Sequence, residues 1–330
     1  MKKFLIPFLK IVIPLALGVL LIWLVYKDLT PEDISDIKSA FKEMNYLYIF
    51  LSVFIGLISH MSRAWRWRYP LKEMGYTPQF WNSYHTVMIG YFANMGIPRS
   101  GEIMRCGLMA KYENIPFNKL VGTVIAERVA DLIILGSCIF FVFIIQLETL
   151  TNYAVEIGLA EKFSPLKLIT YLLVLAFLGI VGILILKRSR NKFAIKVREF
   201  LLGIYEGLKT ILTMKDKWLY IAHTLFIWVL YLAMFYVTFF SLSSVENVPF
   251  TGVVTAFVMG GIAVTVTNGG IGAYPLAIAG VLALYGVTQS QGYAFGWVVW
   301  TGQTIMLVLA GLVSSILLPR MNKTSVESEG

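Results

Sequence analysis

The chain has 330 residues, of which 58% are hydrophobic and only 14% charged, and its mean hydropathy is +0.73. An average soluble domain spends about a quarter of its residues on charge, so this composition excludes an ordinary soluble protein and predicts a multi-pass helical membrane protein. The net charge of +9 does not indicate nucleic acid as a partner, because the basic residues cluster beside apolar segments, as in cytoplasmic loops.

Long apolar segments follow one another along the chain, and a run of about 20 residues spans a bilayer core. The first segment, 4–26, lacks the cleavage pattern of a signal peptide and is expected to remain as a helix. Further spans are predicted over 46–62, 117–146, 168–186 and 218–242. The tract 247–319 contains no Asp, Glu, Lys or Arg. The two cysteines, Cys106 and Cys138, offer no disulfide framework.

Loop charge predicts the orientation of these spans. Residues 187–217 carry nine Lys and Arg side chains, which places this loop in the cytoplasm. Residues 147–164 carry three Glu against Lys162 alone and are expected outside. Basic residues near each end of the chain place both termini in the cytoplasm: Lys2, Lys3, Arg320 and Lys323.

Parity predicts a re-entrant hairpin in the first half. Basic residues at 63–72 place residue 72 inside, so the chain crosses an odd number of times before it reaches 147 outside. Two apolar segments lie between, and the first, 80–95, is therefore expected to enter and return, with its tip near 94–100. The sequence Asn-x-Gly-Ile begins at Asn94 and again at Asn268, which predicts a second hairpin in the tract after 247.

The two halves of the chain share one pattern. Each has an amphipathic segment between its first two spans, at 30–44 and at 193–211. Each half thus contains a span, an interfacial helix, a span, a hairpin and a span, over residues 1–146 and 165–319. An external linker, 147–164, joins them, and 320–330 form a short cytoplasmic tail.

The predicted fold is therefore an all-α polytopic bundle of about six full spans and two re-entrant hairpins, arranged as an inverted repeat. Transporters commonly use this plan, with the binding site at mid-membrane between the repeats. The alternative is that Asn-x-Gly-Ile occurs twice by chance and that the chain makes eight full spans.

The hairpin tips are candidate binding elements. Glycine and proline suit broken helices, and the N-terminus of a half-helix attracts an anion such as phosphate. The candidates are Asn94 and Gly101 at the first tip, and Asn268, Gly269, Gly270, Gly272 and Tyr274 at the second. The plain alternative is close packing of helices through glycine, as expected for Gly292 and Gly296.

Three ionisable residues, Glu127, Arg128 and Asp131, begin about 15 Å inside an apolar helix. Each costs at least about 2.5–3.5 kcal/mol against lipid, so we expect all three to face inward and to be paired. The partners expected on the first hairpin are Arg99, Glu102 and Arg105, and the six charges sum to zero. This set predicts a polar chamber for a charged headgroup, with Arg99 and Arg105 as phosphate ligands. The alternative is an ion-pair network that only fixes the hairpin.

Further polar residues have plainer explanations. Arg63, Arg66 and Arg68 alternate with Trp65 and Trp67 at the end of the second span, as in an interfacial anchor. A second hypothesis for this motif is that Arg63 and Arg66 gather anionic lipid headgroups. The three histidines, His60, His85 and His223, have no metal-ligand spacing and are interpreted as packing or surface residues. No P-loop or nucleophile elbow is present in the sequence, so ATP-driven transport and common hydrolase mechanisms lack support.

Four motifs occur in order: Ser62-Arg63-Ala64-Trp65-Arg66-Trp67, Pro98-Arg99-Ser100-Gly101-Glu102-Ile103-Met104-Arg105, Glu127-Arg128-Val129-Ala130-Asp131 and Gly269-Gly270-Ile271-Gly272. With them, nearly the whole chain resembles the flippase-like membrane domain of the lysylphosphatidylglycerol synthase (multiple peptide resistance factor) family. The resemblance implies a bacterial inner-membrane protein that moves a phospholipid or another phosphate-bearing lipid between leaflets.

Two departures from this family limit the resemblance. The chain stops eleven residues after Pro319, without the soluble aminoacyl-transferase domain of full-length synthases, so aminoacylation of lipid is not expected. Tyr274-Pro275 stand where many relatives carry an acidic residue, so a lysyl-lipid substrate does not follow.

We therefore expect a lipid transporter that is not an enzyme and uses no cofactor or metal. Its expected partners are membrane lipids, anionic or phosphate-bearing, and also a second copy of the chain or a separate lipid-modifying enzyme. Two alternatives stay open: a membrane-embedded enzyme that uses Glu127 or Asp131 as acid or base on a phospholipid or polyprenyl phosphate, and a non-transporting scaffold.

Overall fold

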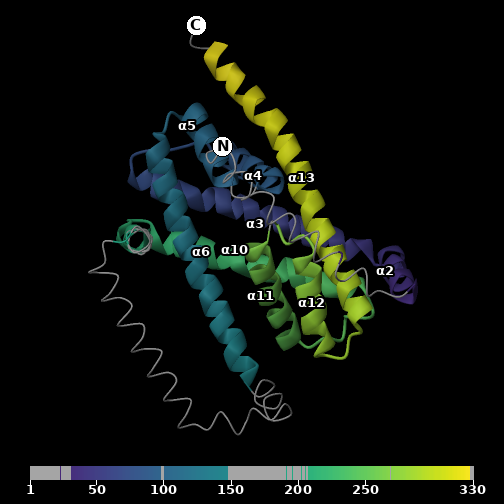
Figure 1. Cartoon of the computed structure of the whole chain (residues 1–330). Coiled ribbons are helices and arrows are strands. Elements are labelled where there is room, and N and C mark those ends of the chain that lie inside the picture. Colours follow the sequence, from purple (N-terminus) through teal and green to yellow (C-terminus); the bar gives the residue numbers. More distant parts are fainter. Residues whose placement is uncertain are drawn as a thin grey trace, which may run out of the picture. The chain divides into compact units, whose positions relative to one another are not determined.

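The computed structural model describes residues 31–97, 100–147, 207–267 and 269–327, with single residues at 23, 191, 195, 202 and 205. Every regular element in these ranges is a helix (Figure 1), which confirms the predicted all-α polytopic fold. The predicted spans 4–26 and 168–186, the linker 147–164 and most of the amphipathic segment 193–211 lie outside the described residues, apart from single positions.

Four of the described helices are long and apolar enough to cross a membrane. They are α3 (Tyr46–Glu73), α6 (Phe117–Ile145), α10 (Lys217–Thr238, continued by the 3-10 turn η2, Phe239–Ser241) and α13 (Gln289–Glu327). The predicted end of the second span, at residue 62, was too early. The helix continues to Glu73, and Arg63 and Arg66 in this extension are buried.

Two helical hairpins occur where the breaks were predicted. The first joins α4 (Phe80–Gly96) to α5 (Gly101–Glu113), and the second joins α11 (Phe250–Val266) to α12 (Ala273–Ala283). The longest of these four helices has 17 residues, or about 26 Å, which is short for a bilayer core of about 30 Å. These lengths favour two hairpins over unbroken crossings in these segments.

The open ends of the first hairpin lie together. Glu113 Oε1 accepts hydrogen bonds from the Gln79 backbone N–H at 3.0 Å and from Asn82 Nδ2 at 2.7 Å. The chain therefore enters and leaves α4–α5 at one end, as the parity argument requires. Ahead of α3, the amphipathic segment forms α2 (Pro31–Glu43), as predicted.

The chain divides into two compact units: residues 1–124 with 213–330, and residues 125–212, so that the boundary falls within α6. The predicted repeats, 1–146 and 165–319, are a different division and stay a prediction. Within the first unit, one hydrophobic cluster joins α10, α11, α12 and α13, and a second joins the end of α3 to α4, α5 and the start of α6.

Helices α3 and α10 lie antiparallel along their full lengths. At one end the Asn45 backbone N–H donates to the Ser241 carbonyl at 2.8 Å, and at the other Lys72 Nζ lies 2.8 Å from Asp216 Oδ2. The last residue of α3 and the first of α10 therefore lie at the same end of the pair. This agrees with the prediction that both lie on one side of the membrane, and that this side is the cytoplasm stays a prediction.

Glycine lets α13 approach the second hairpin closely. A Cβ at Gly292 would lie 2.9 Å from Ala279 Cα, and one at Gly296 would lie 2.5 Å from Pro275 Cα, both on α12. The close-packing role expected for these two glycines is confirmed. Further along, α13 meets α4, where Asn322 and Asn82 exchange side-chain hydrogen bonds at 2.9 and 3.1 Å.

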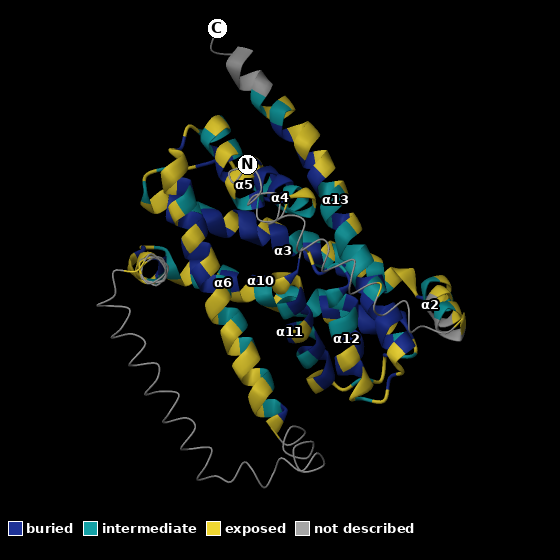
Figure 2. Ribbon diagram, in the orientation of Figure 1, coloured by how far each residue is buried: buried dark blue, intermediate teal, exposed yellow. Residues whose placement is uncertain are grey.

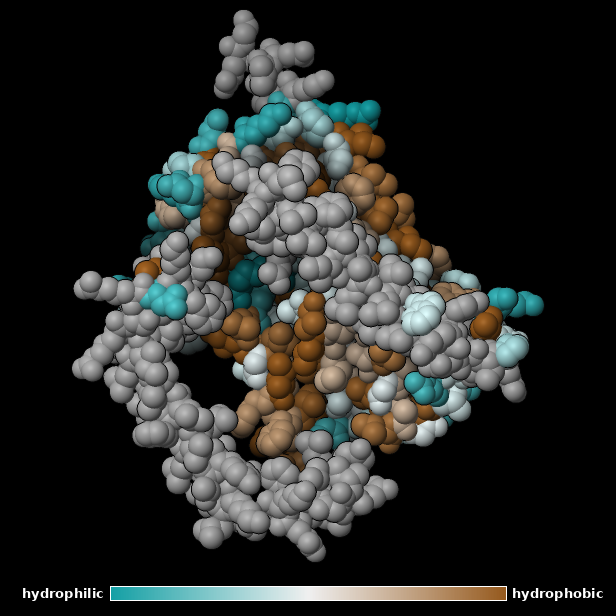
Figure 3. Space-filling view, viewed as in Figure 1, coloured by the Kyte–Doolittle hydropathy of each residue, from teal (hydrophilic) through white to brown (hydrophobic). Residues whose placement is uncertain are grey.

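Burial differs between the helices (Figure 2). Residues of α3 and α4 that turn toward the bundle are buried, whereas most of α6 beyond residue 131 is exposed. Hydrophobic residues, brown in Figure 3, make up much of the visible surface of the described helices. Exposed apolar surface that extends over several helices is rare in soluble monomers, so this surface suits contact with lipid.

Candidate functional site

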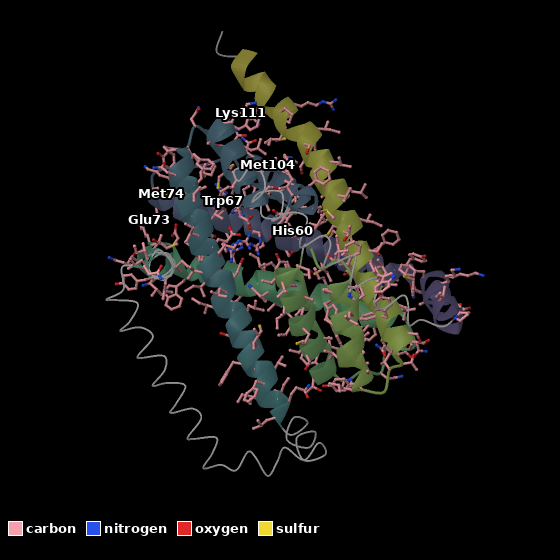
Figure 4. The ribbon with its side chains drawn as sticks, viewed as in Figure 1. His60, Trp67, Glu73, Met74, Met104 and Lys111 are labelled. Atoms are coloured by element: carbon pink, nitrogen blue, oxygen red, sulfur yellow. The ribbon has the colours of Figure 1, made fainter. Side chains whose placement is uncertain are left out.

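A stripe of buried polar side chains runs along one face of α3. Arg63 is 3% exposed and Arg66 is fully buried, one turn apart at i,i+3 spacing. Trp67, labelled in Figure 4, follows on the same face and is 1% exposed. Both arginines therefore point into the bundle.

Residues of α10 receive these two arginines. Arg63 Nη2 donates to the Tyr231 hydroxyl at 3.1 Å, and Arg66 Nη1 donates to Thr224 Oγ1 at 2.9 Å. The Arg66 guanidinium also lies over the Tyr220 ring, 5.3 Å from its centroid. Hydroxyls and an aromatic ring thus orient both guanidinium groups without removing their positive charge.

The first hairpin contributes a third buried arginine. Arg105, on α5, is 4% exposed, and its guanidinium carbon lies 3.8 Å from the centroid of the Trp67 ring. Trp67 Nε1 in turn donates to Thr123 Oγ1 at 2.7 Å. We call Arg63, Arg66 and Arg105 the buried arginine cluster. All three and their named partners belong to the first compact unit.

The anchor interpretation of the Arg–Trp motif applies to only part of it. Trp65 is exposed and Arg68 lies over its ring, 4.8 Å from the centroid, as suits an interfacial anchor. Arg63 and Arg66 lie on the opposite, buried side. The motif therefore alternates between two faces, because adjacent residues of a helix point about 100° apart.

Two of the three histidines lie beside the buried arginine cluster. His60 is buried between the rings of Tyr91 and Tyr231, at 4.8 and 6.3 Å, and His223 Nδ1 shares a hydrogen bond of 2.8 Å with Ser62 Oγ. The third, His85, bonds Ser314 Oγ at 3.0 Å. All three pack inside the bundle. Within the described residues, no group of three His, Cys, Asp or Glu side chains could hold a metal ion.

Sequence reasoning missed the contribution of α10. Its polar and tyrosine side chains recur on one face of an otherwise apolar helix, at positions 220, 223, 224 and 231. This spacing follows the helical period and is the signal that could have identified the face.

At the first tip, Asn94 closes the hairpin. Its Oδ1 accepts from the Gly101 backbone N–H at 2.7 Å, so the first donor of α5 is used within the protein. A Cβ at Gly101 would clash with the carbonyl oxygen of Gly90, so Gly101 is needed for close approach of α4 and α5. Glu102 is half-buried. Arg99 lies outside the described residues.

At the second tip, Gly269, Gly270 and Gly272 have positive φ angles of 65°, 79° and 70°, a conformation that favours glycine. Trp300 Nε1 donates to the Gly269 carbonyl at 2.7 Å. Tyr274 packs against the apolar cluster of α10–α13, where a Cβ at Gly260 would lie 2.6 Å from its ring. Asn268 lies outside the described residues.

The charged residues of α6 belong to the second compact unit. Glu127 is buried, and Arg128 Nη1 lies 3.9 Å from Asp131 Oδ2, the expected i,i+3 pair. The expectation that all three face inward is wrong for Arg128, whose side chain is 47% exposed. The predicted chamber of six charges stays a prediction, because Arg99 is not described and Glu102 and Arg105 belong to the first unit.

Comparison with known proteins identifies the family. Residues 11–311 match the sequence profile described as the lysylphosphatidylglycerol synthase TM region. The chain belongs to this family. The lysylphosphatidylglycerol synthase TM family is associated with lipid-related functions in membranes, and the present member is embedded in a membrane.

One curated relative and the solved structures complete the comparison. The chain is similar to the UPF0104 membrane protein MJ1595 of Methanocaldococcus jannaschii, with 29% identity over 109 residues. The match covers 32% of this chain and 32% of that protein, so it spans about a third of the relative's length. No solved structure matches the chain.

Proposed function

We propose that the protein is a flippase-like transporter that moves a phosphate-bearing lipid between the two leaflets of its membrane. The observation that carries this proposal is the buried arginine cluster. A guanidinium fork matches phosphate oxygens in both geometry and charge. An arginine inside a membrane protein costs at least about 2.5 kcal/mol against lipid, so three buried within one compact unit support a role in binding an anion.

In this proposal the headgroup enters the protein at the buried arginine cluster while the acyl chains stay in the bilayer. Thr224 and Tyr231 accept hydrogen bonds from Arg66 and Arg63, and Tyr220 lies under the Arg66 guanidinium, so α10 orients two of the three guanidinium groups of the cluster. The lipid leaves chemically unchanged, so the protein is not an enzyme in this proposal. It acts in a bacterial plasma membrane with both termini in the cytoplasm, alone, with a second copy or with a lipid-modifying enzyme.

Leaflet exchange tests the proposal directly. The purified chain would be reconstituted into phosphatidylcholine vesicles that contain labelled phosphatidylglycerol, and the label reached by an external quencher would be followed in time. We expect exchange well above that of protein-free vesicles. Arg105→Ala and Arg66→Ala should each slow it by about tenfold or more, because each removes a charge-assisted contact to phosphate.

The matched control is Arg68→Ala, which removes an arginine from the exposed side of the same helix and should change the rate by less than about twofold. Glu127→Gln tests the predicted charge on α6 in the same assay. Unchanged exchange in Arg66→Ala and Arg105→Ala, with the fold intact by circular dichroism, would show that the proposed site is wrong. Conversion of the lipid by the pure protein would instead favour an enzyme. Mass spectrometry of co-purified lipids would name the substrate.

A further inference from the structure

The contact between Arg105 and Trp67 is the closest of the arginine–aromatic contacts in the buried arginine cluster. The guanidinium carbon of Arg105 lies 3.8 Å from the ring centroid, against 5.3 Å for Arg66 over Tyr220 and 6.0 Å for Arg63 beside Tyr231. A separation of 3.8 Å is van der Waals contact. The guanidinium carbon therefore sits directly above the indole.

This position determines which way the donors of Arg105 can point. A guanidinium donates its hydrogen bonds in its own plane, and an aromatic face attracts it by electrostatics without accepting those in-plane donors. Stacking on Trp67 therefore occupies one flat face of the group and directs its N–H bonds sideways. In the proposed function, a phosphate oxygen bound by Arg105 lies in the plane of the guanidinium, and contact with the ring sets the orientation of that plane.

Trp67 and Arg105 each have a further contact within the protein. Trp67 donates its indole N–H to Thr123 Oγ1 at 2.7 Å, and the Thr123 hydroxyl donates to the Leu120 carbonyl at 2.7 Å. On the other side, Gly90 gives room to the stem of Arg105, because a Cβ at Gly90 would lie 3.3 Å from Arg105 Cβ. Both side chains are buried, Trp67 with 1% and Arg105 with 4% of its surface exposed.

We propose that Trp67 is a positioning residue that orients Arg105 for the phosphodiester of a lipid headgroup. The inference rests on the proposed function and deepens it by assigning a role to a residue that carries no charge. Lysine at position 105 would keep the positive charge but lose the planar fork that stacks on the ring. Affinity for phosphatidylglycerol should therefore depend on the pair Trp67–Arg105 and not on charge alone.

Binding in detergent tests the inference separately from transport. Short-chain phosphatidylglycerol would be titrated into the purified full chain, with short-chain diacylglycerol, which lacks the phosphodiester, as the comparison, and isothermal titration calorimetry would report binding. We expect Trp67→Leu to weaken binding by about tenfold, as for loss of a buried cation–π contact. Trp67→Phe should weaken it by less, because the ring face remains. Thr123→Val tests the support of the indole and should fall between the two.

Two controls separate positioning from general damage. Trp81→Leu removes an exposed tryptophan of α4 and should bind like the unchanged protein. A double-mutant cycle compares Trp67→Leu, Arg105→Lys and the double variant, and the double variant should be no weaker than the worse single one, because both changes break one stack. If Trp67→Leu fails to fold, Thr123→Val replaces it in the cycle with Arg105→Lys, because Thr123→Val removes the hydrogen bond that holds the indole.

Each outcome decides a different point. Binding by Trp67→Leu equal to that of the unchanged protein, or additive effects in the cycle, would overturn the positioning role and leave the proposed function standing. Trp67-dependent binding without leaflet exchange in vesicles would support the positioning role and overturn transport. Equal, weak binding of phosphatidylglycerol and diacylglycerol by the unchanged protein would overturn both.

Discussion

Arg66 and Arg68 lie two positions apart on α3 and differ in surroundings. Arg66 is fully buried with Thr224 and Tyr220, whereas Arg68 lies over the exposed ring of Trp65. We expect Arg66→Ala to destabilise the fold by about 2 kcal/mol or more, because it removes a hydrogen bond to a charged group and leaves a cavity. Arg68→Ala should cost less than about 1 kcal/mol. Thermal unfolding in one detergent measures both, and equal losses would contradict the assigned burial.

Two glycines of α5 have different surroundings, and the first hairpin depends on only one of them. A methyl group at Gly101 would clash with Gly90 and Asn94, whereas one at Gly107, also on α5, meets nothing within 4 Å. Gly101→Ala should therefore force α4 and α5 apart and destabilise the protein by about 2–3 kcal/mol. Gly107→Ala should be neutral or stabilise it by up to about 1 kcal/mol through helix propensity. Protease resistance and melting temperature measure the difference, and tolerance of alanine at Gly101 would mean that the tip packs less closely.

For the whole molecule, the antiparallel pair α3–α10 predicts which residues face which side of the membrane. With Cys106 and Cys138 replaced by serine, single cysteines would be placed by Lys72→Cys and Glu246→Cys, both exposed positions. A membrane-impermeant thiol reagent added to intact cells should label only the second, because a span of 25 residues, Lys217–Ser241, separates the two ends. Both should react after permeabilisation. Equal labelling of both in intact cells would show that α10 does not cross.

Hydropathy and the residues that favour turns were sufficient to predict most of the described helices from the sequence. The apolar runs predicted α6 and α10 to within a few residues, and the amphipathic pattern of residues 30–44 predicted α2. Glycine, proline and asparagine predicted both hairpin breaks, because few other residues tolerate such turns. These are local properties of the chain, and local sequence determines them. The extent of α3 was predicted wrongly, since three arginines resemble the end of a span when their burial is unknown.

The sequence by itself determined the class of this protein, its family, the positions of several of its described helices and the two breaks at the hairpin tips. Only the tertiary structure decided that Arg63 and Arg66 turn inward onto α10, more than 150 residues away, and that Arg105 stacks on Trp67. The physical reason is that an arginine near a membrane surface can satisfy its charge in two ways, by reaching water or by packing on rings and hydroxyls of another helix. Which of these occurs depends on the face that a distant helix presents, and no local pattern in α3 contains that information.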